Sequence, residues 1–424
     1  MKVAVIGGGS TYTPELVQGI AARGNSLGID ELVLQDINPE RLEVVGGFAE
    51  RILANVGRPG LLKLTEDLDA ALTGASFCLV QLRVGGLRAR LKDETIPHRF
   101  GILGQETTGP GGFAKALRTV PVVLDIADRY AALGDPDGWL IDFTNPVAIV
   151  SQALADNGYR AVGLCNLPIG LQREVAAAFG VDASRVELES VGLNHASWFR
   201  EVRIDGESVM AELMSRHIDR VTEETGWSAA EIEEAGAIPS YYQAYYHHPK
   251  EIFAEQIAKG TRAEEVIGVE RGLLELYKDP DLVEKPALLN ERGGAWYSEA
   301  AIEVIEALGS STGRNLVVNV PNGDAFGDLP PDLVVEVTCL VDTTGARPRP
   351  GVPLTPEQRR LVLALHNYQR LTIRAALSGD RRVAVDALAA NPLVPSLDVA
   401  EALLDALLNA HREHLPAFFA SSGS

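Results

Sequence analysis

The sequence predicts an α/β fold with a parallel sheet in its first part, followed by a mixed α+β region. A short apolar run at residues 2–6 leads directly into three glycines. From Leu16 onward the apolar positions recur with helical spacing. Further apolar runs then alternate with helical stretches up to about residue 170, and a repeated strand-helix-strand order implies parallel pairing of the strands.

The elements are expected in the following order. Strands are predicted at residues 2–6, 31–35, 75–81, 139–143 and 161–164 of the first region. The alternation weakens beyond them, so we predict two domains, 1–170 and 171–424. In the second domain, strands at 185–191 and 198–204 flank a turn, helical stretches run through 208–310, strands follow at 315–320 and 332–341, and the C-terminus is helical.

Composition limits the possible functions. With 424 residues, 46% of them hydrophobic, the chain can bury a large core. Its formal net charge of −20 argues against nucleic acid or an anionic membrane as a partner, although a small basic pocket for one phosphate is compatible with it. Three scattered cysteines form no disulfide framework, and neither a signal peptide nor a membrane-spanning run is evident. We therefore expect a cytoplasmic protein.

The loop after the first predicted strand is typical of a dinucleotide-binding turn. Glycines allow the backbone to approach a pyrophosphate, and the following helix offers free N–H groups. Asp36 ends the second strand, where a carboxylate accepts hydrogen bonds from the ribose hydroxyls and favours NAD over NADP. Tyr12 stands where the full fingerprint has a third glycine, so a ligand-free turn is the alternative. The first domain is accordingly predicted to be Rossmann-like, with a cofactor-binding set of Gly7, Gly8, Gly9, Ser10, Thr11, Asp36 and Arg41.

Cys165 and His195 are candidate ligands for a divalent metal. Cys165 follows a predicted strand of the parallel sheet, at the edge where α/β proteins bind ligands, and His195 lies in the turn of the next strand pair. Each residue alone has a simpler interpretation, because free cysteine is often buried as a small hydrophobe and a histidine in a turn is often only hydrogen-bonded.

An aromatic cluster at residues 241–248 has two interpretations. It can be an amphipathic helix that buries its rings, or it can supply a tyrosine base. The ordinary tyrosine pKa near 10 is too high for a base, so a cation must lower it, and Arg99 and the metal are the candidates. The adjacent His247 and His248 would point in different directions on a helix, so they are not assigned as ligands.

Glycine-rich turns carry further candidates. The run Gln105–Gly112 predicts a rigid loop that closes over a ligand, or one that simply begins a helix. Arg83 and Arg292 lie beside glycine pairs, where a guanidinium can bind an anion with two hydrogen bonds. The alternative for such arginines is a surface ion pair.

These motifs, taken in order, resemble the NAD- and metal-dependent family 4 glycoside hydrolases, and in particular the 6-phospho-β-glucosidase type. The resemblance runs through nearly the whole chain. It covers residues 6–16, 83–86, 104–112, 142–146, 165–168, 192–195, 292–300 and 318–323. The Cys-Asn-x-Pro form at 165–168 is similar to the β-specific members.

The resemblance implies a hydrolysis that uses a redox cofactor without net oxidation. NAD takes hydride from carbon 3 of the sugar, a base removes the proton from carbon 2, the aglycone leaves from carbon 1, water adds, and the hydride returns. The implied substrate is a phosphosugar glycoside such as cellobiose 6-phosphate, and the implied product is glucose 6-phosphate. A homodimer or homotetramer is also implied.

Site roles follow from the same resemblance. Cys165 and His195 match the metal ligands, usually of Mn(II). Tyr242 matches the base within a Pro-x-x-Tyr-x-x-Tyr-Tyr pattern, and Tyr241 is the alternative because a shift of one residue would exchange them. Arg83, Asn145 and Arg292 match residues that hold the sugar phosphate or its hydroxyls, and Asn166 occupies a substrate position at the catalytic centre. An amide cannot act as a general acid, so no residue is assigned to protonate the leaving group.

Three other functions fit the same sequence. The chain could be an NAD-dependent dehydrogenase of a sugar or hydroxy acid, a family 4 glycosidase for an unphosphorylated β-glycoside, or a catalytically silent NAD-binding regulator. Net accumulation of NADH would identify the first, and unphosphorylated cellobiose as a substrate would identify the second.

Overall fold

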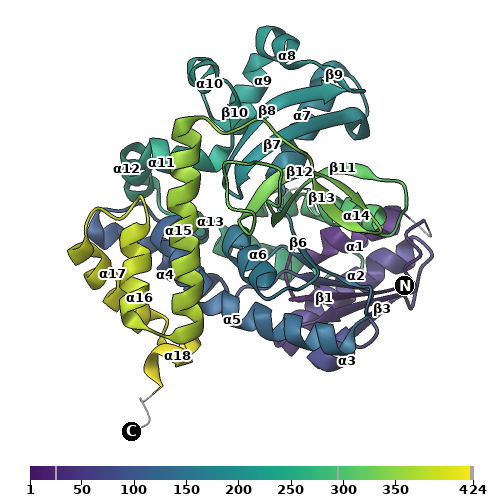
Figure 1. Cartoon of the computed structure of the whole chain (residues 1–424). Coiled ribbons are helices and arrows are strands. Elements are labelled where there is room, and N and C mark those ends of the chain that lie inside the picture. Colours follow the sequence, from purple (N-terminus) through teal and green to yellow (C-terminus); the bar gives the residue numbers. More distant parts are fainter. Residues whose placement is uncertain (24–25, 294–295, 421–424) are drawn as a thin grey trace.

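A nine-stranded sheet forms the centre of the molecule, within residues 1–23, 26–293 and 296–420 that this computed structural model describes. Across the sheet the strand order is β13-β12-β11-β6-β5-β4-β1-β2-β3. Figure 1 labels β1, β3, β6, β11, β12 and β13 of this sheet. In chain order these strands are β1 (Lys2–Ile6), β2 (Glu31–Gln35), β3 (Leu62–Thr65), β4 (Phe77–Val80), β5 (Trp139–Asp142), β6 (Ala161–Gly163), β11 (Arg314–Pro321), β12 (Val334–Asp342) and β13 (Gly345–Pro348).

The parallel part of the sheet confirms the predicted fold class. β1 pairs in parallel with β2 on one side and with β4 on the other. β3 pairs in parallel with β2, and on the other side β5 pairs with β4 and β6 with β5. Val3 to Ile6 of β1 are all buried, as expected for a strand covered on both faces. The chain order changes direction between β1 and β4, and at such a switch point the carboxyl ends of the strands leave room for a ligand.

Strand β3 was absent from the prediction. It has only four residues, it lies at the edge of the sheet, and Lys63 and Leu64 are exposed on it. A short strand with little buried surface carries too weak a periodic signal to be recognised. The same holds for β13, and for the two-residue strands β9 (Glu207–Ser208) and β10 (Ile238–Pro239).

Helices connect the parallel strands and begin where the sequence supports a start. α1 (Thr13–Ala22) has a proline in its first turn, and α2 (Pro39–Asn55) is capped by Asn38, whose side chain accepts a hydrogen bond from the backbone N–H of Arg41. The long α5 (Gly109–Leu133) packs against α4 (Gly86–Thr95), α6 (Val147–Asp156) and α15 (Pro356–Ser378).

A second, antiparallel sheet lies beside the first. Its main pair is β7 (Val186–Leu193) and β8 (Ala196–Ile204), joined by the two-residue turn Asn194-His195, and β9 and β10 pair with β8. The predicted strands at 185–191 and 198–204 correspond to this pair. α7 (Leu167–Phe179) packs on β7, and α8 (Met210–Arg216), α9 (Ile218–Thr225) and α10 (Ala229–Ala235) lie at the far end of this part in Figure 1.

Residues late in the chain complete the first core. The predicted strand pair at 315–320 and 332–341 is present as β11 and β12, and it extends the parallel sheet through antiparallel pairing with β6. One hydrophobic cluster includes residues from Val3 to Leu415. The predicted C-terminal helices are α15, α16 (Arg381–Ala390), α17 (Leu397–Ala410) and α18 (Pro416–Phe419). In the part of the chain that is described, no helix combines the length and apolar character needed to cross a membrane. Positions 294 and 295 of the 292–300 motif lie outside the described residues.

Candidate active site

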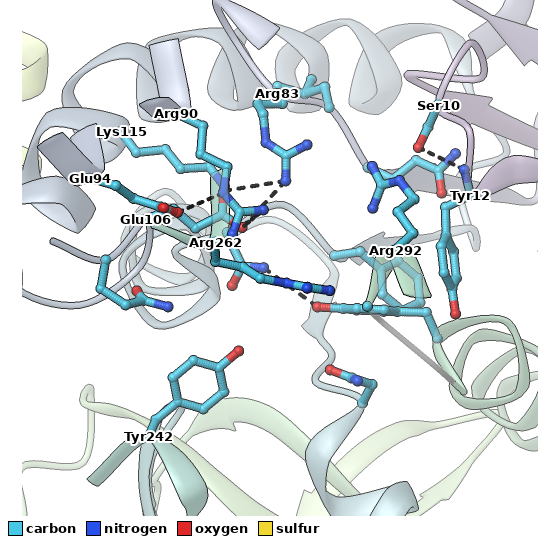
Figure 2. A pocket seen from close by; sticks show the side chains of 18 of the residues that line it. Ser10, Tyr12, Arg83, Arg90, Glu94, Glu106, Lys115, Tyr242, Arg262 and Arg292 are labelled. Atoms are coloured by element: carbon cyan, nitrogen blue, oxygen red, sulfur yellow. Dashed lines mark hydrogen bonds and ion pairs between the residues drawn. The ribbon is translucent and has the colours of Figure 1, made fainter. Parts of the chain in front are cut away.

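A cavity of about 360 Å³ opens at the carboxyl ends of the parallel strands. The segments that follow β1, β4, β5 and β6 all contribute to its wall, as the switch-point geometry predicts. The predicted site residues that line it are Ser10, Arg83, Asn145, Asn166, Tyr241, Tyr242 and Arg292. Figure 2 shows Tyr242 on one side of this cavity, and Arg83, Arg90, Lys115, Arg262 and Arg292 along the other.

The glycine loop has the geometry of a dinucleotide turn. Gly7 adopts a φ of +88°, which favours glycine, and a Cβ atom on Gly8 would lie 2.7 Å from the Cβ of Leu34. A Cβ atom on Gly9 would lie 2.8 Å from Asp36 Oδ2. Tyr12 precedes α1 without forming a side-chain cap. In the first turn of that helix the N–H groups of Thr13 and Glu15 donate to the carbonyls of Ser10 and Tyr12, and a proline stands between them.

Asp36 and Arg41 both contact this loop. Asp36 Oδ2 accepts a hydrogen bond from the Gly9 N–H at 2.9 Å, and Arg41 Nε donates to the Gly9 carbonyl at 3.1 Å. Arg41 also forms an ion pair with Glu270 at 2.8 Å, and Thr11 accepts a hydrogen bond from Arg292 Nε at 2.7 Å. The structure therefore brings the predicted cofactor-binding set together, and this set fits a dinucleotide.

Cys165 and His195 are buried just behind the cavity wall. Asn194 connects them, because it directly precedes His195 and its side chain hydrogen-bonds the sulfur of Cys165. Burial raises the pKa of the Cys165 thiol to about 12, and the nearby Glu336 carboxylate acts in the same direction. Burial lowers the pKa of His195 to about 3, so its imidazole is neutral and able to bind a metal.

This donor set fits a metal that takes its remaining ligands from elsewhere. Within the described residues, no group of three or more His, Cys, Asp or Glu side chains is placed to hold a metal. A thiolate and an imidazole would leave several positions for oxygen ligands from substrate or water, and Mn(II) prefers oxygen. The pair therefore suits a metal that binds together with a hydroxylated substrate.

Tyr242 stacks on His195 and points its hydroxyl into the cavity (Figure 2). Burial raises its pKa well above the ordinary value, and the proximity of Cys165 adds to this. Tyr241 also lines the cavity, but its side chain is 47% exposed. The geometry therefore favours Tyr242 over Tyr241 as the base.

Glu106 is the centre of a buried ionic cluster opposite Tyr242. It forms ion pairs with Arg83 at 3.3 Å, Arg90 at 3.1 Å and Lys115 at 2.9 Å. Burial by itself raises the pKa of Glu106, but these three cations hold it well below its ordinary value. Burial also lowers the pKa of Lys115 to about 8.

Two buried polar atoms of residues that line the cavity lack a partner in the described part of the chain. Arg83 Nε and Asn145 Oδ1 have no hydrogen bond to any of the residues that the structure describes. Arg292 reaches the same region, and burial together with repulsion from Arg83 lowers its pKa to about 10. Buried donors and acceptors of this kind are normally satisfied, so an unpartnered guanidinium N–H and an unpartnered amide oxygen indicate a polar ligand that both accepts and donates hydrogen bonds.

The structure corrects the prediction for Arg99. This residue lies in the 3-10 helix Pro97–Phe100, its side chain is exposed, and it does not line the cavity. It therefore has no position from which to lower the pKa of a tyrosine in the cavity.

Several cavity residues were missed in the sequence, notably Arg90, Glu94, Lys115, Arg262 and Tyr297. Arg90 and Glu94 form an ion pair four residues apart on α4, a spacing visible in the sequence but equally common on exposed helices. No local pattern distinguishes an inward from an outward ion pair of this kind.

The fold and the site together define an α/β protein that combines a dinucleotide turn with a cavity for an anionic small molecule. Comparison with known proteins defines it further. Residues 2–181 match the model of the family 4 glycosyl hydrolases, and residues 190–394 match the model of their C-terminal domain, so the chain belongs to this family. The family and the fold class predicted from the sequence are confirmed.

Individual relatives cover almost the whole chain. It is 42% identical to a probable 6-phospho-beta-glucosidase of Bacillus subtilis (strain 168), in an alignment 434 residues long that covers 99% of this chain and 98% of that protein. It is 37% identical to the 6-phospho-beta-glucosidase of Escherichia coli (strain K12), and the alignment covers 99% of this chain and 97% of that protein. The structure of the 6-phospho-beta-glucosidase of Thermotoga maritima with manganese, NAD+ and glucose 6-phosphate superposes with a TM-score of 0.92, at 33% identity, covering 98% of this chain and 99% of that one.

Proposed function

We propose that this protein is an NAD- and Mn(II)-dependent 6-phospho-β-glucosidase that releases glucose 6-phosphate from substrates such as cellobiose 6-phosphate. The observation that carries the proposal is the charge of the cavity. Its lining contains five cationic side chains against two anionic ones, in a chain of net charge −20. A local excess of positive charge on an acidic protein supports a small anionic substrate.

The names of the relatives support the same substrate class. Proteins 42% and 37% identical over nearly the whole length are called 6-phospho-β-glucosidases, and the Thermotoga maritima structure contains glucose 6-phosphate. In this chain, Arg83, Asn145 and Arg292 are proposed to hold the phosphate and hydroxyls of the sugar. The unpartnered Nε of Arg83 and Oδ1 of Asn145 support this assignment.

The proposed cofactors match the residues at the two ends of the site. The glycine loop with Asp36 would hold NAD, and Cys165 with His195 would hold the metal. When bound, NAD supplies a reversible hydride acceptor for carbon 3, and the metal polarises the oxygens on carbons 2 and 3. The manganese and NAD+ in the Thermotoga maritima structure support this pair of cofactors.

The chain itself would supply the base. Tyr242 Oη is proposed to remove the proton from carbon 2, because its hydroxyl points into the cavity opposite the cationic wall. The sugar must be held so that this proton faces the phenol, which is the task of the arginines and Asn145. Asn166 lies in the same wall and is proposed to contact the substrate near the scissile bond.

The decisive experiment compares cellobiose 6-phosphate with cellobiose, each with NAD and Mn(II), in deuterated water. We expect glucose 6-phosphate from the phosphorylated substrate only, deuterium at carbon 2 of the product, and no net NADH. Stoichiometric NADH would instead establish a dehydrogenase, and turnover of cellobiose would establish a glycosidase for unphosphorylated substrates. Absence of deuterium at carbon 2 would refute the elimination mechanism. The homodimeric or homotetrameric state and the cytoplasmic location stay predictions.

A further inference from the structure

The glycine-rich loop at residues 105–112 contacts the candidate metal ligand His195. Thr107 Oγ1 lies 2.9 Å from His195 Nδ1. We propose that Thr107, oriented by Gln105, is a positioning residue that holds His195 with its proton on Nδ1 and the lone pair of Nε2 directed to the metal. This inference rests on the metal-binding part of the proposed function.

The first step is the orientation of the Gln105 side chain. The backbone N–H groups of Thr107 and Thr108 both donate to Gln105 Oε1, the latter at 2.8 Å. Backbone N–H groups can only donate, so the atom they meet must be the amide oxygen and not the amide nitrogen. Any further hydrogen-bond partner of Gln105 Oε1 must therefore be a donor.

The second step concerns the single proton of the Thr107 hydroxyl. Thr107 Oγ1 also lies 2.8 Å from Gln105 Oε1, and because that oxygen can only accept, the hydroxyl proton is directed to it. Thr107 Oγ1 then has only lone pairs to offer to His195. The imidazole must donate from Nδ1, which leaves Nε2 unprotonated in the neutral ring and able to bind a metal.

The stacking on Tyr242 explains why this hydrogen bond is needed. The rings of His195 and Tyr242 are stacked with centroids 3.5 Å apart and an angle of 9° between their planes, which fixes the plane of the imidazole. A half-turn of the imidazole about its Cβ–Cγ bond would preserve the stack while moving Nε2 to the other edge. The Thr107 contact distinguishes these two orientations.

The backbone of His195 adds a second constraint on the ring. His195 has a φ of 65°, in the left-handed region, within the tight turn between β7 and β8. Such a conformation is uncommon for residues other than glycine and is often found at functional sites. With the backbone and ring plane both determined, the hydrogen bond to Thr107 sets the remaining degree of freedom.

Manganese binding tests the proposal without measuring turnover. The full-length protein with NAD is titrated with Mn(II), and free Mn(II) is followed by electron paramagnetic resonance. In Thr107→Val the hydroxyl is lost at nearly constant volume, and we expect the Kd for Mn(II) to rise by about 10- to 100-fold. Thr107→Ser keeps the hydroxyl and should bind nearly as well as the unmodified protein.

Thr119→Val is the matched control. Thr119 is also buried, on α5, but its Oγ1 has no hydrogen-bond partner among the described residues. The same substitution there should leave the Kd unchanged. Equal Kd values for Thr107→Val and the unmodified protein would overturn the proposal, and so would a Thr107→Ser variant as weak as Thr107→Val.

The tautomer of the His195 imidazole can also be measured directly by ¹⁵N NMR. In the metal-free protein labelled with ¹⁵N-histidine, the His195 signal, assigned by its loss in His195→Gln, should show the proton on Nδ1. A proton on Nε2 would refute the proposal. If the unmodified protein does not bind Mn(II), the metal part of the proposed function fails, whereas the ¹⁵N spectrum still decides the orientation of His195.

Discussion

The imidazole of His195 lies flat against the phenol of Tyr242, with ring centroids 3.5 Å apart. The two residues come from separate segments, the β7–β8 turn and the 3-10 helix Tyr241–Gln243. The stack places the proposed base beside the proposed metal ligand. A cation bound at His195 would therefore favour the ionised phenol, against the burial that raises the pKa of Tyr242 in the metal-free protein.

Replacing Tyr242 by phenylalanine should abolish most of the activity without unfolding the protein. The ring and its stack remain, but the group that accepts the carbon-2 proton is lost, so kcat should fall by about 10²- to 10⁴-fold. Steady-state kinetics and deuterium incorporation at carbon 2 measure this. Tyr241→Phe is the control, because Tyr241 is 47% exposed and should retain both activity and exchange. The opposite pattern would identify Tyr241 as the base.

Affinity for Mn(II) should increase with pH. Burial raises the pKa of Cys165 to about 12, so the free protein carries a protonated thiol at neutral pH, and metal binding must release that proton. His195, with a pKa lowered to about 3 by burial, is already neutral and releases none. One released proton predicts an association constant that rises about tenfold for each pH unit between about pH 6 and 8.

Isothermal titration calorimetry in two buffers of different ionisation enthalpy measures this proton count directly. The expected value is one proton released per Mn(II) bound. Cys165→Ser should weaken binding strongly and remove most of the pH dependence. A dependence centred on the ordinary histidine pKa near 6.5 would show that His195, not Cys165, controls the titration.

Removing Glu336 should destabilise the fold around both metal ligands. This buried carboxylate accepts hydrogen bonds from Asn194 Nδ2 at 2.8 Å and from Ser197 Oγ at 2.7 Å. Glu336→Ala leaves these buried donors unpaired, so the free energy of unfolding should fall by about 2–4 kcal/mol. Urea unfolding measures the loss. Glu207→Ala is the control, because Glu207 is an exposed strand residue. Its free energy of unfolding should differ from that of the unmodified protein by no more than about 0.5 kcal/mol.

Neutralising Glu106 should also be costly. Glu106→Gln leaves Arg83, Arg90 and Lys115 facing one another in a buried cluster, which should lower the free energy of unfolding by about 3–5 kcal/mol. The double variant Glu106→Gln/Lys115→Met removes one of the three cations and should recover part of the loss. If both variants unfold at the same urea concentration as the unmodified protein, the cluster contributes nothing to stability.

The elements that could be predicted from the sequence are those with a strong local signal. The continuous apolar runs at residues 2–6 and 31–35 became β1 and β2 with the same bounds. The glycine loop and Asp36 were recognised because a turn between strand and helix requires particular backbone conformations. Short edge strands such as β3 were missed, because half of their residues face solvent.

The site was predictable where its residues follow strands. Asn145, Cys165 and Asn166 lie two or three residues after the end of β5 or β6, and the carboxyl ends of parallel strands meet at one edge. Residues on helices were not predictable in this way. Lys115 was missed and Arg99 was assigned wrongly, because the direction in which a helix faces depends on what packs against it.

The sequence by itself determined the parallel strands β1, β2, β4, β5 and β6 and the dinucleotide turn, since these depend on periodicity and backbone conformation over a few residues. The roles of Cys165, His195 and Tyr242 were predicted from the resemblance to the family. Only the tertiary structure decided that Glu106 is neutralised by three cations and that Thr107 and Tyr242 both hold the ring of His195. Burial and hydrogen-bond partners depend on contacts between segments that are distant in the sequence. Thr107 and His195, for example, are 88 residues apart, and local pattern carries no information on such contacts.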